Sequence, residues 1–213
     1  MVGNGSQPWR RRDDENMLSF LYSWDVGLFF LINQKGQNDF FDWFMPFMTD
    51  LKNFIYVFPL VAIWVLWKEK QRGIMTLVFL GLTITITDQL SSHFLKEWVG
   101  RVRPCHVLEQ VRLVLTDCNT SYSFPSSHAV NIFAAAYFLS QPLKRFALPF
   151  YFIASLVAYS RVYIGIHYPL DNILGAGIGI LVAWPLWRLG DHTWKKIIAR
   201  PRGVVPKNRS CQK

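Results

Sequence analysis

The chain has little charge and little cysteine, and both shortages narrow its class. Charged residues make up 17% of its 213 residues, whereas an ordinary soluble domain carries about 25%. Hydrophobic residues make up 51%, so the chain is too apolar to be disordered. Three cysteines are too few for a disulfide-rich scaffold or a cysteine-rich zinc site. The sequence shows no collagen, heptad or solenoid period, which excludes fibrous and repeat architectures.

The apolar residues are gathered into long runs, which indicates that the bilayer is the solvent. Six runs can be distinguished, at about 17–33, 53–67, 74–95, 128–143, 146–164 and 170–188. Because a membrane-spanning helix needs about 20 apolar residues, the pattern predicts an all-α integral membrane protein, a six-helix bundle. The first run contains Asp25, and the aromatic segment 40–48 is typical of a bilayer interface. We therefore also expect an interfacial helix near the N-terminus.

The positively charged residues divide unevenly between the two ends of these runs. A six-span arrangement places 16 of the 23 lysines and arginines on one side. Since these residues are enriched on the cytoplasmic side of membrane proteins, both termini are expected there. The predicted organisation is a polar N-terminus over 1–16, a six-span domain over 17–190 and a basic tail over 191–213. The net charge of +9 then reflects orientation in the membrane and not a nucleic-acid partner.

The long connection 96–127 is consequently expected on the extracytoplasmic side. Cys105 and Cys118 lie in this connection, whereas Cys211 lies in the basic tail. Because disulfides form in oxidising compartments, we predict a disulfide between Cys105 and Cys118.

Three polar clusters lie at the outer ends of the runs. They are residues 96–104, 125–128 and 160–171. Lys96, Arg103 and Arg161 supply fixed positive charge that matches a phosphate group. Ser126 and Ser127 stand just before an apolar run, where a helix N-terminus offers free N–H groups to an anion. The clusters therefore predict an oxyanion site on the outer face.

Two histidines and a carboxylate add reactive groups to this site. His128 and His167 can divide the roles of acid and nucleophile. Asp171 lies four residues after His167, where its carboxylate can orient the imidazole. No group of acidic residues has the spacing of metal ligands, so we expect neither a metal nor a cofactor. Asp88, inside the third run, is interpreted as a partner in a helix–helix hydrogen bond.

Each of these groups also has a plain structural interpretation. Ser126 can simply cap a helix, and Asp171 can be an acidic residue favoured in a first helical turn. Arg161 can extend to the membrane edge, and His128 or His167 can be a satisfied structural residue. These separate interpretations do not explain why so many such groups share one membrane face.

The three clusters resemble the signature of the type 2 phosphatidic acid phosphatases, a superfamily of integral membrane lipid phosphatases. That signature has Lys, six residues and Arg-Pro, then Pro-Ser-Gly-His, then Ser-Arg, five residues, His, three residues and Asp. The same spacings are found here in Lys96 to Pro104, Pro125 to His128 and Ser160 to Asp171. Ser127 replaces the usual glycine, a change that keeps the backbone N–H available to phosphate.

The resemblance implies a phosphohistidine mechanism acting on a lipid phosphate in the bilayer. His167 would attack phosphorus while Asp171 orients its ring. His128 would protonate the leaving oxygen and then activate the water that hydrolyses the intermediate. The phosphate oxygens would be held by five residues, Lys96, Arg103, Ser126, Ser127 and Arg161.

The outer-leaflet position and the bare six-span core favour a lipid with a small, strongly anionic head group. We expect undecaprenyl diphosphate, with phosphatidylglycerophosphate close behind in a broad-specificity enzyme of the bacterial inner (cell) membrane. One alternative is a lipid A phosphatase of the same superfamily. A soluble vanadium-dependent haloperoxidase shares the pocket but is disfavoured by the apolar runs. A non-enzymatic transporter or scaffold is disfavoured by the intact His128, His167 and Asp171.

Overall fold

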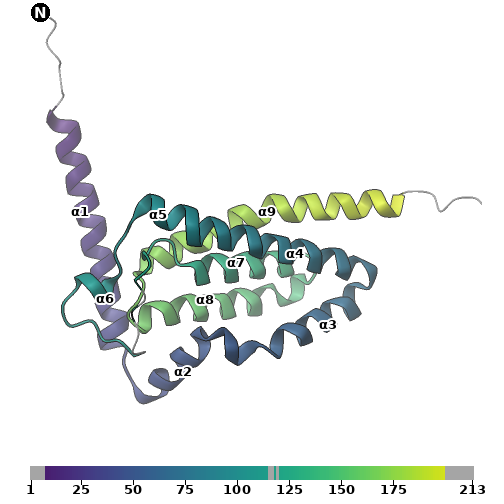
Figure 1. Ribbon diagram of the computed structural model, residues 1–213, viewed down its shortest axis with the longest axis horizontal. Coiled ribbons are helices and arrows are strands. Elements are labelled where there is room, and N and C mark those ends of the chain that lie inside the picture. The colour runs from purple at the N-terminus through teal and green to yellow at the C-terminus, as the bar shows by residue number, and fades with distance from the viewer. Residues whose placement is uncertain (1–7, 115–117, 119, 200–213) are drawn as a thin grey trace, which may run out of the picture.

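The computed structural model describes residues 8–114, 118 and 120–199, and these residues form helices and connections without any strand (Figure 1). The α-helices are α1 (Pro8–Phe30), α2 (Asp39–Thr49), α3 (Val57–Glu69), α4 (Gln71–Gln89), α5 (Lys96–Val99), α6 (Pro104–Val107), α7 (Ser127–Ser140), α8 (Ala147–Tyr163) and α9 (Pro169–Ala199). Short π-helical turns η1 (Leu31–Lys35) and η3 (Leu90–Leu95) extend α1 and α4, and 3-10 turns η2 (Leu51–Phe54) and η4 (Lys144–Phe146) precede α3 and α8. The predicted all-α class is confirmed.

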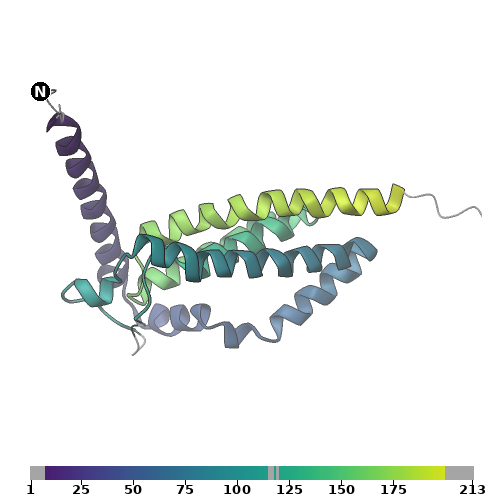
Figure 2. The ribbon, with the colours of Figure 1, turned by 45° about the horizontal axis from the view of Figure 1, so that its top comes forward.

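Helix α7 is the centre of a bundle formed with α3, α4, α8 and α9 (Figures 1 and 2). It packs directly against α4, α8 and α9. Its sequence is rich in alanine, and Val130, Ala134 and Phe138 are fully buried in the described chain. Small side chains allow helix backbones to approach closely, which is how helices associate in membranes. The helix that carries the second polar cluster is therefore enclosed by its neighbours.

Glycines on α9 bring its backbone against α7. A Cβ atom at Gly179 would lie 2.2 Å from the carbonyl oxygen of Val130, a distance that no side chain tolerates. A Cβ atom at Gly175 would lie 3.2 Å from the carbonyl oxygen of Ser126. This close approach places the first turn of α9 beside the first turn of α7, where two of the polar clusters lie.

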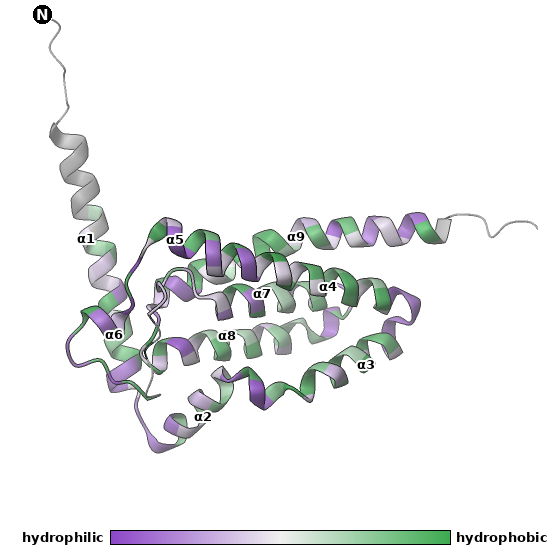
Figure 3. Cartoon of the chain, in the orientation of Figure 1, coloured by the Kyte–Doolittle hydropathy of each residue, from purple (hydrophilic) through white to green (hydrophobic). Residues whose placement is uncertain are grey.

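Four described helical segments are long and apolar enough to cross a membrane. They are Leu51–Glu69, Gln71–Val107, Lys144–Tyr163 and Pro169–Ile197. Figure 3 shows hydrophobic residues along α3 and α4, and a hydrophilic stretch at the connection between them. The other two expected runs, 17–33 and 128–143, fall in α1 with η1 and in α7. Because α7 has 14 residues and is shielded by the bundle, length and composition alone do not mark it as a span.

Helix α1 does not run along the bundle. In Figures 1 and 2 it leaves the bundle at a steep angle, from the end where α2, α5 and α6 lie. Its C-terminal part meets α9 and places Asp25 and Phe29 in the interior, while Phe20 and Trp24 are exposed. The first apolar run therefore contributes to the same end of the molecule as the polar clusters.

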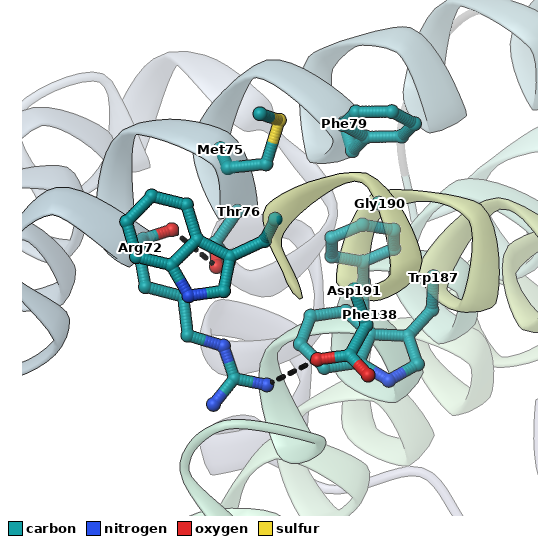
Figure 4. A pocket seen from close by; sticks show the side chains of 9 residues that line it. Arg72, Met75, Thr76, Phe79, Phe138, Trp187, Gly190 and Asp191 are labelled. Atoms are coloured by element: carbon teal, nitrogen blue, oxygen red, sulfur yellow. Dashed lines mark hydrogen bonds and ion pairs between the residues drawn. The ribbon is translucent and has the colours of Figure 1, made fainter. Parts of the chain in front are cut away.

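The opposite end of the bundle is closed by an ion pair between α4 and α9. Arg72 donates to Asp191 at 2.8 Å (Figure 4). Lys195 lies 2.6 Å from the same carboxylate. The pocket beside this pair, lined by Phe138 and Trp187 among others, has a volume of about 10 Å³. That volume holds about one water molecule, so the pocket is too small for a lipid head group.

A disulfide joins α6 to the loop that precedes α7. Cys105 and Cys118 are bonded, with their Cα atoms 6.4 Å apart. The bond connects the first polar cluster, which ends at Pro104, to the segment that leads into the second cluster. The structure thus contains the cysteine pair expected from the sequence.

Candidate active site

The three polar clusters meet at one end of the bundle. The first lies on α5 and the irregular segment after it, the second at the start of α7, and the third in the turn between α8 and α9 (Figure 1). The N–H of Ser126 donates to the carbonyl of Asp171 at 3.2 Å, and the N–H of Ser123 donates to that of Arg101 at 2.6 Å. Backbone hydrogen bonds therefore fix the clusters to one another.

His167 lies in a tight turn that directs its ring toward Asp171. Gly165 in this turn has a φ of 91°, a conformation that glycine adopts without steric cost. Nδ1 of His167 lies 3.7 Å from Oδ2 of Asp171 and 3.5 Å from Oγ of Ser123. Because Nδ1 faces this side, Nε2 is the nitrogen left for attack on a substrate.

Asp171 is held by donors from several segments. Ser123 donates its hydroxyl to Oδ2, and the N–H of Tyr168 donates to the same oxygen at 2.9 Å. Arg101 donates to Oδ1 at 2.6 Å. With this many partners the carboxylate has one orientation, and the imidazole of His167 is oriented in turn.

Burial keeps His167 neutral. The ring is almost wholly inaccessible, and removal from water lowers its pKa to about 3, with Arg161 and Arg103 adding to the decrease and Asp171 opposing it. A neutral imidazole has a free lone pair, so His167 is in the form required of a nucleophile at neutral pH.

Three cations from different elements lie close to the two histidines and Asp171. Lys96 and Arg103 are buried, and both lie within electrostatic range of Asp171, while Arg161 lies within electrostatic range of both cations. Nε of Arg161 has no hydrogen-bond partner, although its NH1 group donates to Oγ1 of Thr49 at 2.6 Å. Buried charges are costly unless they are paired. An anion bound among these three cations would therefore offset the cost of burying their charge.

Arg103 also has a structural task. Its Nε and NH2 groups donate to the carbonyl and hydroxyl oxygens of Ser121, at 2.7 and 2.8 Å. Its NH1 group donates to the carbonyl of Ile166 at 3.4 Å. Arg103 thus ties the loop before α7 to the turn that carries His167, and two of its five N–H donors remain for a ligand.

The start of α7 has the form expected of an anion-binding helix N-terminus. Ser126 is the N-cap, and its Oγ accepts from the N–H of Ala129 at 3.5 Å. Oγ of Ser127 lies 3.1 Å from Oγ of Ser92 on η3. The ring of His128 lies near the backbone of Thr49 and within electrostatic range of Arg161 and His167. The capping interpretation and the anion-site interpretation of Ser126 are compatible.

A cavity opens beside Arg161. It has a volume of about 510 Å³. Seven residues line it: Trp43, Pro46, Phe47, Thr49, Asp50, Asn53 and Arg161. The walls come from α2, η2 and the connection between them, with Arg161 from α8. The aromatic segment predicted at the bilayer interface therefore borders the cation cluster.

Four residues of this region were absent from the predicted site: Asp25, Thr49, Arg101 and Ser123. Arg101 and Ser123 lie close in sequence to predicted residues, but no spacing rule indicated their contacts. Asp25 carried a signal, because a charge inside an apolar run needs a partner. Asp88 behaves as predicted, since its carboxylate on α4 accepts from the side chain of Asn131 on α7 at 2.9 Å.

Comparison with known proteins agrees with this arrangement. The family described as the PAP2 superfamily matches residues 76–195, more than half of the chain and a range that contains all three clusters. The chain belongs to the PAP2 superfamily. The resemblance found from the sequence signature is confirmed, and the chain is an integral membrane phosphatase, a hydrolase of phosphate esters.

Individual relatives cover most of the PAP2 chain. A lipid A 4'-phosphatase from Bacteroides thetaiotaomicron is 31% identical over 200 residues, which are 89% of this chain and 85% of the relative. An undecaprenyl-diphosphatase from Sulfolobus acidocaldarius is 29% identical over 163 residues, 75% of each chain. The crystal structure of LpxE from Aquifex aeolicus matches with a TM-score of 0.62 and 28% identity, over 76% of this chain and 94% of that one.

Acidification is expected to destabilise the fold through His167. Its pKa is about 3 in the native protein and about 6.5 when the chain is unfolded. Below pH 6.5 the unfolded state takes up the proton first, so stability falls by up to about 1.4 kcal/mol per pH unit. His167→Gln should flatten the decline of Tm between pH 6.5 and 4.5 in detergent.

The matched control is His192→Gln, at an exposed position near the far end of α9. That variant should retain the slope of the unmodified protein. Identical slopes for all three proteins would contradict a depressed pKa at His167.

Proposed function

We propose that this phosphatase hydrolyses lipid phosphates or diphosphates through a phosphohistidine intermediate on His167. The observation that carries the proposal is the buried cation cluster, with an unpartnered Arg161 Nε, beside a neutral histidine oriented by Asp171. Nε2 of His167 attacks phosphorus, and the bond from phosphorus to the leaving oxygen breaks. Water then attacks the phosphorus of the intermediate, the P–N bond breaks, and inorganic phosphate leaves.

His128 acts as the general acid and then as the general base in this scheme. It gives a proton to the leaving oxygen in the first step and accepts one from the attacking water in the second. Lys96, Arg103 and Arg161, with Ser126 and the N–H group of Ser127, hold the phosphate oxygens on which charge accumulates. Preorganised donors of this kind cost no reorganisation when the reaction occurs.

The site is proposed to face the extracytoplasmic side of the bacterial inner (cell) membrane. Two observations support this orientation. The Cys105–Cys118 disulfide lies at the same end as the polar clusters, and disulfides persist in oxidising compartments. Most lysines and arginines fall at the opposite ends of the six apolar runs, as expected for cytoplasmic segments.

Two lipid classes are the candidate substrates. A polyprenyl diphosphate such as undecaprenyl diphosphate has a compact, highly charged head that suits the three cations, and one relative is an undecaprenyl-diphosphatase. A phosphorylated glycolipid of the lipid A kind is the second candidate. The cavity of about 510 Å³ has aromatic side chains and Asn53 on its walls, which suit a sugar, and another relative is a lipid A 4'-phosphatase.

His167→Ala is expected to lower the rate of phosphate release by about 1,000-fold or more, because no other group at the site can accept the phosphoryl group. His128→Ala should reduce turnover by about 100-fold or more with a lipid substrate. It should reduce turnover less with nitrophenyl phosphate, whose leaving group needs no proton. Full activity in His167→Ala, with His192→Ala as the control for a remote histidine, would disprove the proposed nucleophile.

The substrate is tested with a panel of lipids in matched mixed micelles. We expect kcat/KM for undecaprenyl diphosphate to equal or exceed that for phosphatidic acid and phosphatidylglycerophosphate. Lipid A phosphate is the fourth member of the panel. A strong preference for lipid A phosphate, with the polyprenyl compound inert, would select the glycolipid and leave the mechanism intact.

The orientation is tested by cysteine labelling in intact cells. In a Cys211→Ser background, Gln110→Cys should react with an impermeant maleimide, because position 110 is exposed at the end that carries the disulfide. Lys207→Cys, outside the described residues, should react only after the membrane is permeabilised. The reverse pattern would place the site on the cytoplasmic side.

A further inference from the structure

A chain of charged side chains joins the N-terminal helix to the carboxylate that orients His167. Asp25 on α1, Arg101 after α5 and Asp171 on α9 come from three separate parts of the sequence. One guanidinium nitrogen of Arg101 donates to Asp171 at 2.6 Å, and the other donates to Asp25 at 2.6 Å. Both carboxylates have no exposed surface, and Arg101 is only partly exposed. Such a bridge can transmit the position of α1 to the active site.

The remaining contacts of the bridge make it rigid. The second oxygen of Asp25 accepts from the N–H of Leu170 at 2.8 Å, in the first turn of α9. The guanidinium of Arg101 lies 3.9 Å from the centre of the Tyr168 ring, a cation–π distance. Asp25 therefore fixes both the arginine and the helical turn that carries Asp171.

The charges explain why a second carboxylate is present. Asp171 can stabilise positive charge on His167 only if another cation does not already neutralise its carboxylate. Arg101 alone would compete with His167 for that charge, at a distance where Coulomb attraction is strong. Asp25 neutralises Arg101, so the arginine can orient Asp171 without withdrawing its charge.

We infer that Asp25 and Arg101 are positioning residues of the phosphatase, which act through Asp171 on His167 without touching the phosphate. The inference rests on the proposed nucleophilic role of His167. It makes α1 a functional part of the active site, although Figures 1 and 2 show this helix meeting the bundle only near its C-terminal end. The rate of the chemical step then depends on the placement of α1.

The test uses the full chain in detergent with phosphatidic acid in mixed micelles. Asp25→Asn retains an acceptor for the Leu170 N–H but removes the charge that neutralises Arg101. We expect kcat to fall about 10-fold to 100-fold, the range found when a reacting group is slightly misplaced, while KM changes less than about twofold. Arg161→Gln, at the phosphate site, should instead raise KM strongly.

The double variant Asp25→Asn with Arg101→Gln gives the sharpest readout. Removing both charges leaves no unneutralised arginine beside Asp171. The Asp171 carboxylate still accepts hydrogen bonds from Ser123 and the N–H of Tyr168. The kcat of the double variant should therefore exceed that of Asp25→Asn alone. Two purely structural losses would add together, so a double variant slower than both single variants would overturn the inference.

Matched controls separate this effect from loss of folding. Arg72→Gln breaks an arginine–aspartate pair at the far end of the bundle, and Ser23→Ala removes a hydroxyl of α1 that bonds within its own helix. Both should keep the kcat of the unmodified protein. If Asp25→Asn does not fold, Arg101→Lys carries the test, because one ammonium retains the charge but cannot bridge two carboxylates in the same way.

The outcomes distinguish the inference from the proposed function. If the unmodified protein releases phosphate and His167→Ala does not, the proposed function stands, and a kcat of Asp25→Asn within twofold of the unmodified protein refutes the inference alone. If His167→Ala remains active, the nucleophile is wrong and the positioning role falls with it.

Discussion

Burial of the Asp171 carboxylate is the constraint on which the rest of the site depends. A carboxylate without exposed surface requires several donors, and these are the hydroxyl of Ser123, the N–H of Tyr168 and the guanidinium of Arg101. Each donor belongs to a different short segment or turn, so satisfying one carboxylate fixes the loop before α7, the turn before α9 and the segment after α5. The geometry around His167 is a consequence of this requirement.

The helix packing supplies the enclosure that gives these interactions their strength. Gly175 and Gly179 let α9 approach α7 closely, and this brings the N-cap Ser126 within hydrogen-bond distance of the backbone of Asp171. At the opposite end, Arg72 and Asp191 hold α4 against α9 around a pocket too small for a ligand. The polar chemistry is thus confined to one end of the bundle, next to a cavity bordered by aromatic residues of α2.

The sequence predicted the membrane-spanning helices well where a helix faces lipid directly. It predicted them less well where a helix is surrounded by other helices. The second, third, fifth and sixth apolar runs correspond to segments that are long and apolar enough to span. The fourth run forms α7, a short alanine-rich helix whose surroundings are protein. The first run forms α1 with η1, and its one acidic residue, Asp25, turns inward to an arginine. Apolar composition reports contact with lipid, so it describes a central or obliquely placed helix less well.

The sequence by itself determined the family, the reactive residue types and the cysteine pair, because each depends on residue identity at short, regular spacing. His167 and Asp171 lie four residues apart, and the Ser126 cap and the run of α7 are contiguous, so local geometry suffices to relate them. Only the tertiary structure decided which partners complete the site. Arg101 meets Asp25 across 76 residues, Thr49 meets Arg161 across 112, and Leu170 meets Asp25 across 145. Contacts over such separations follow from how helices pack and from the need to satisfy buried charge, and no spacing in the sequence encodes them.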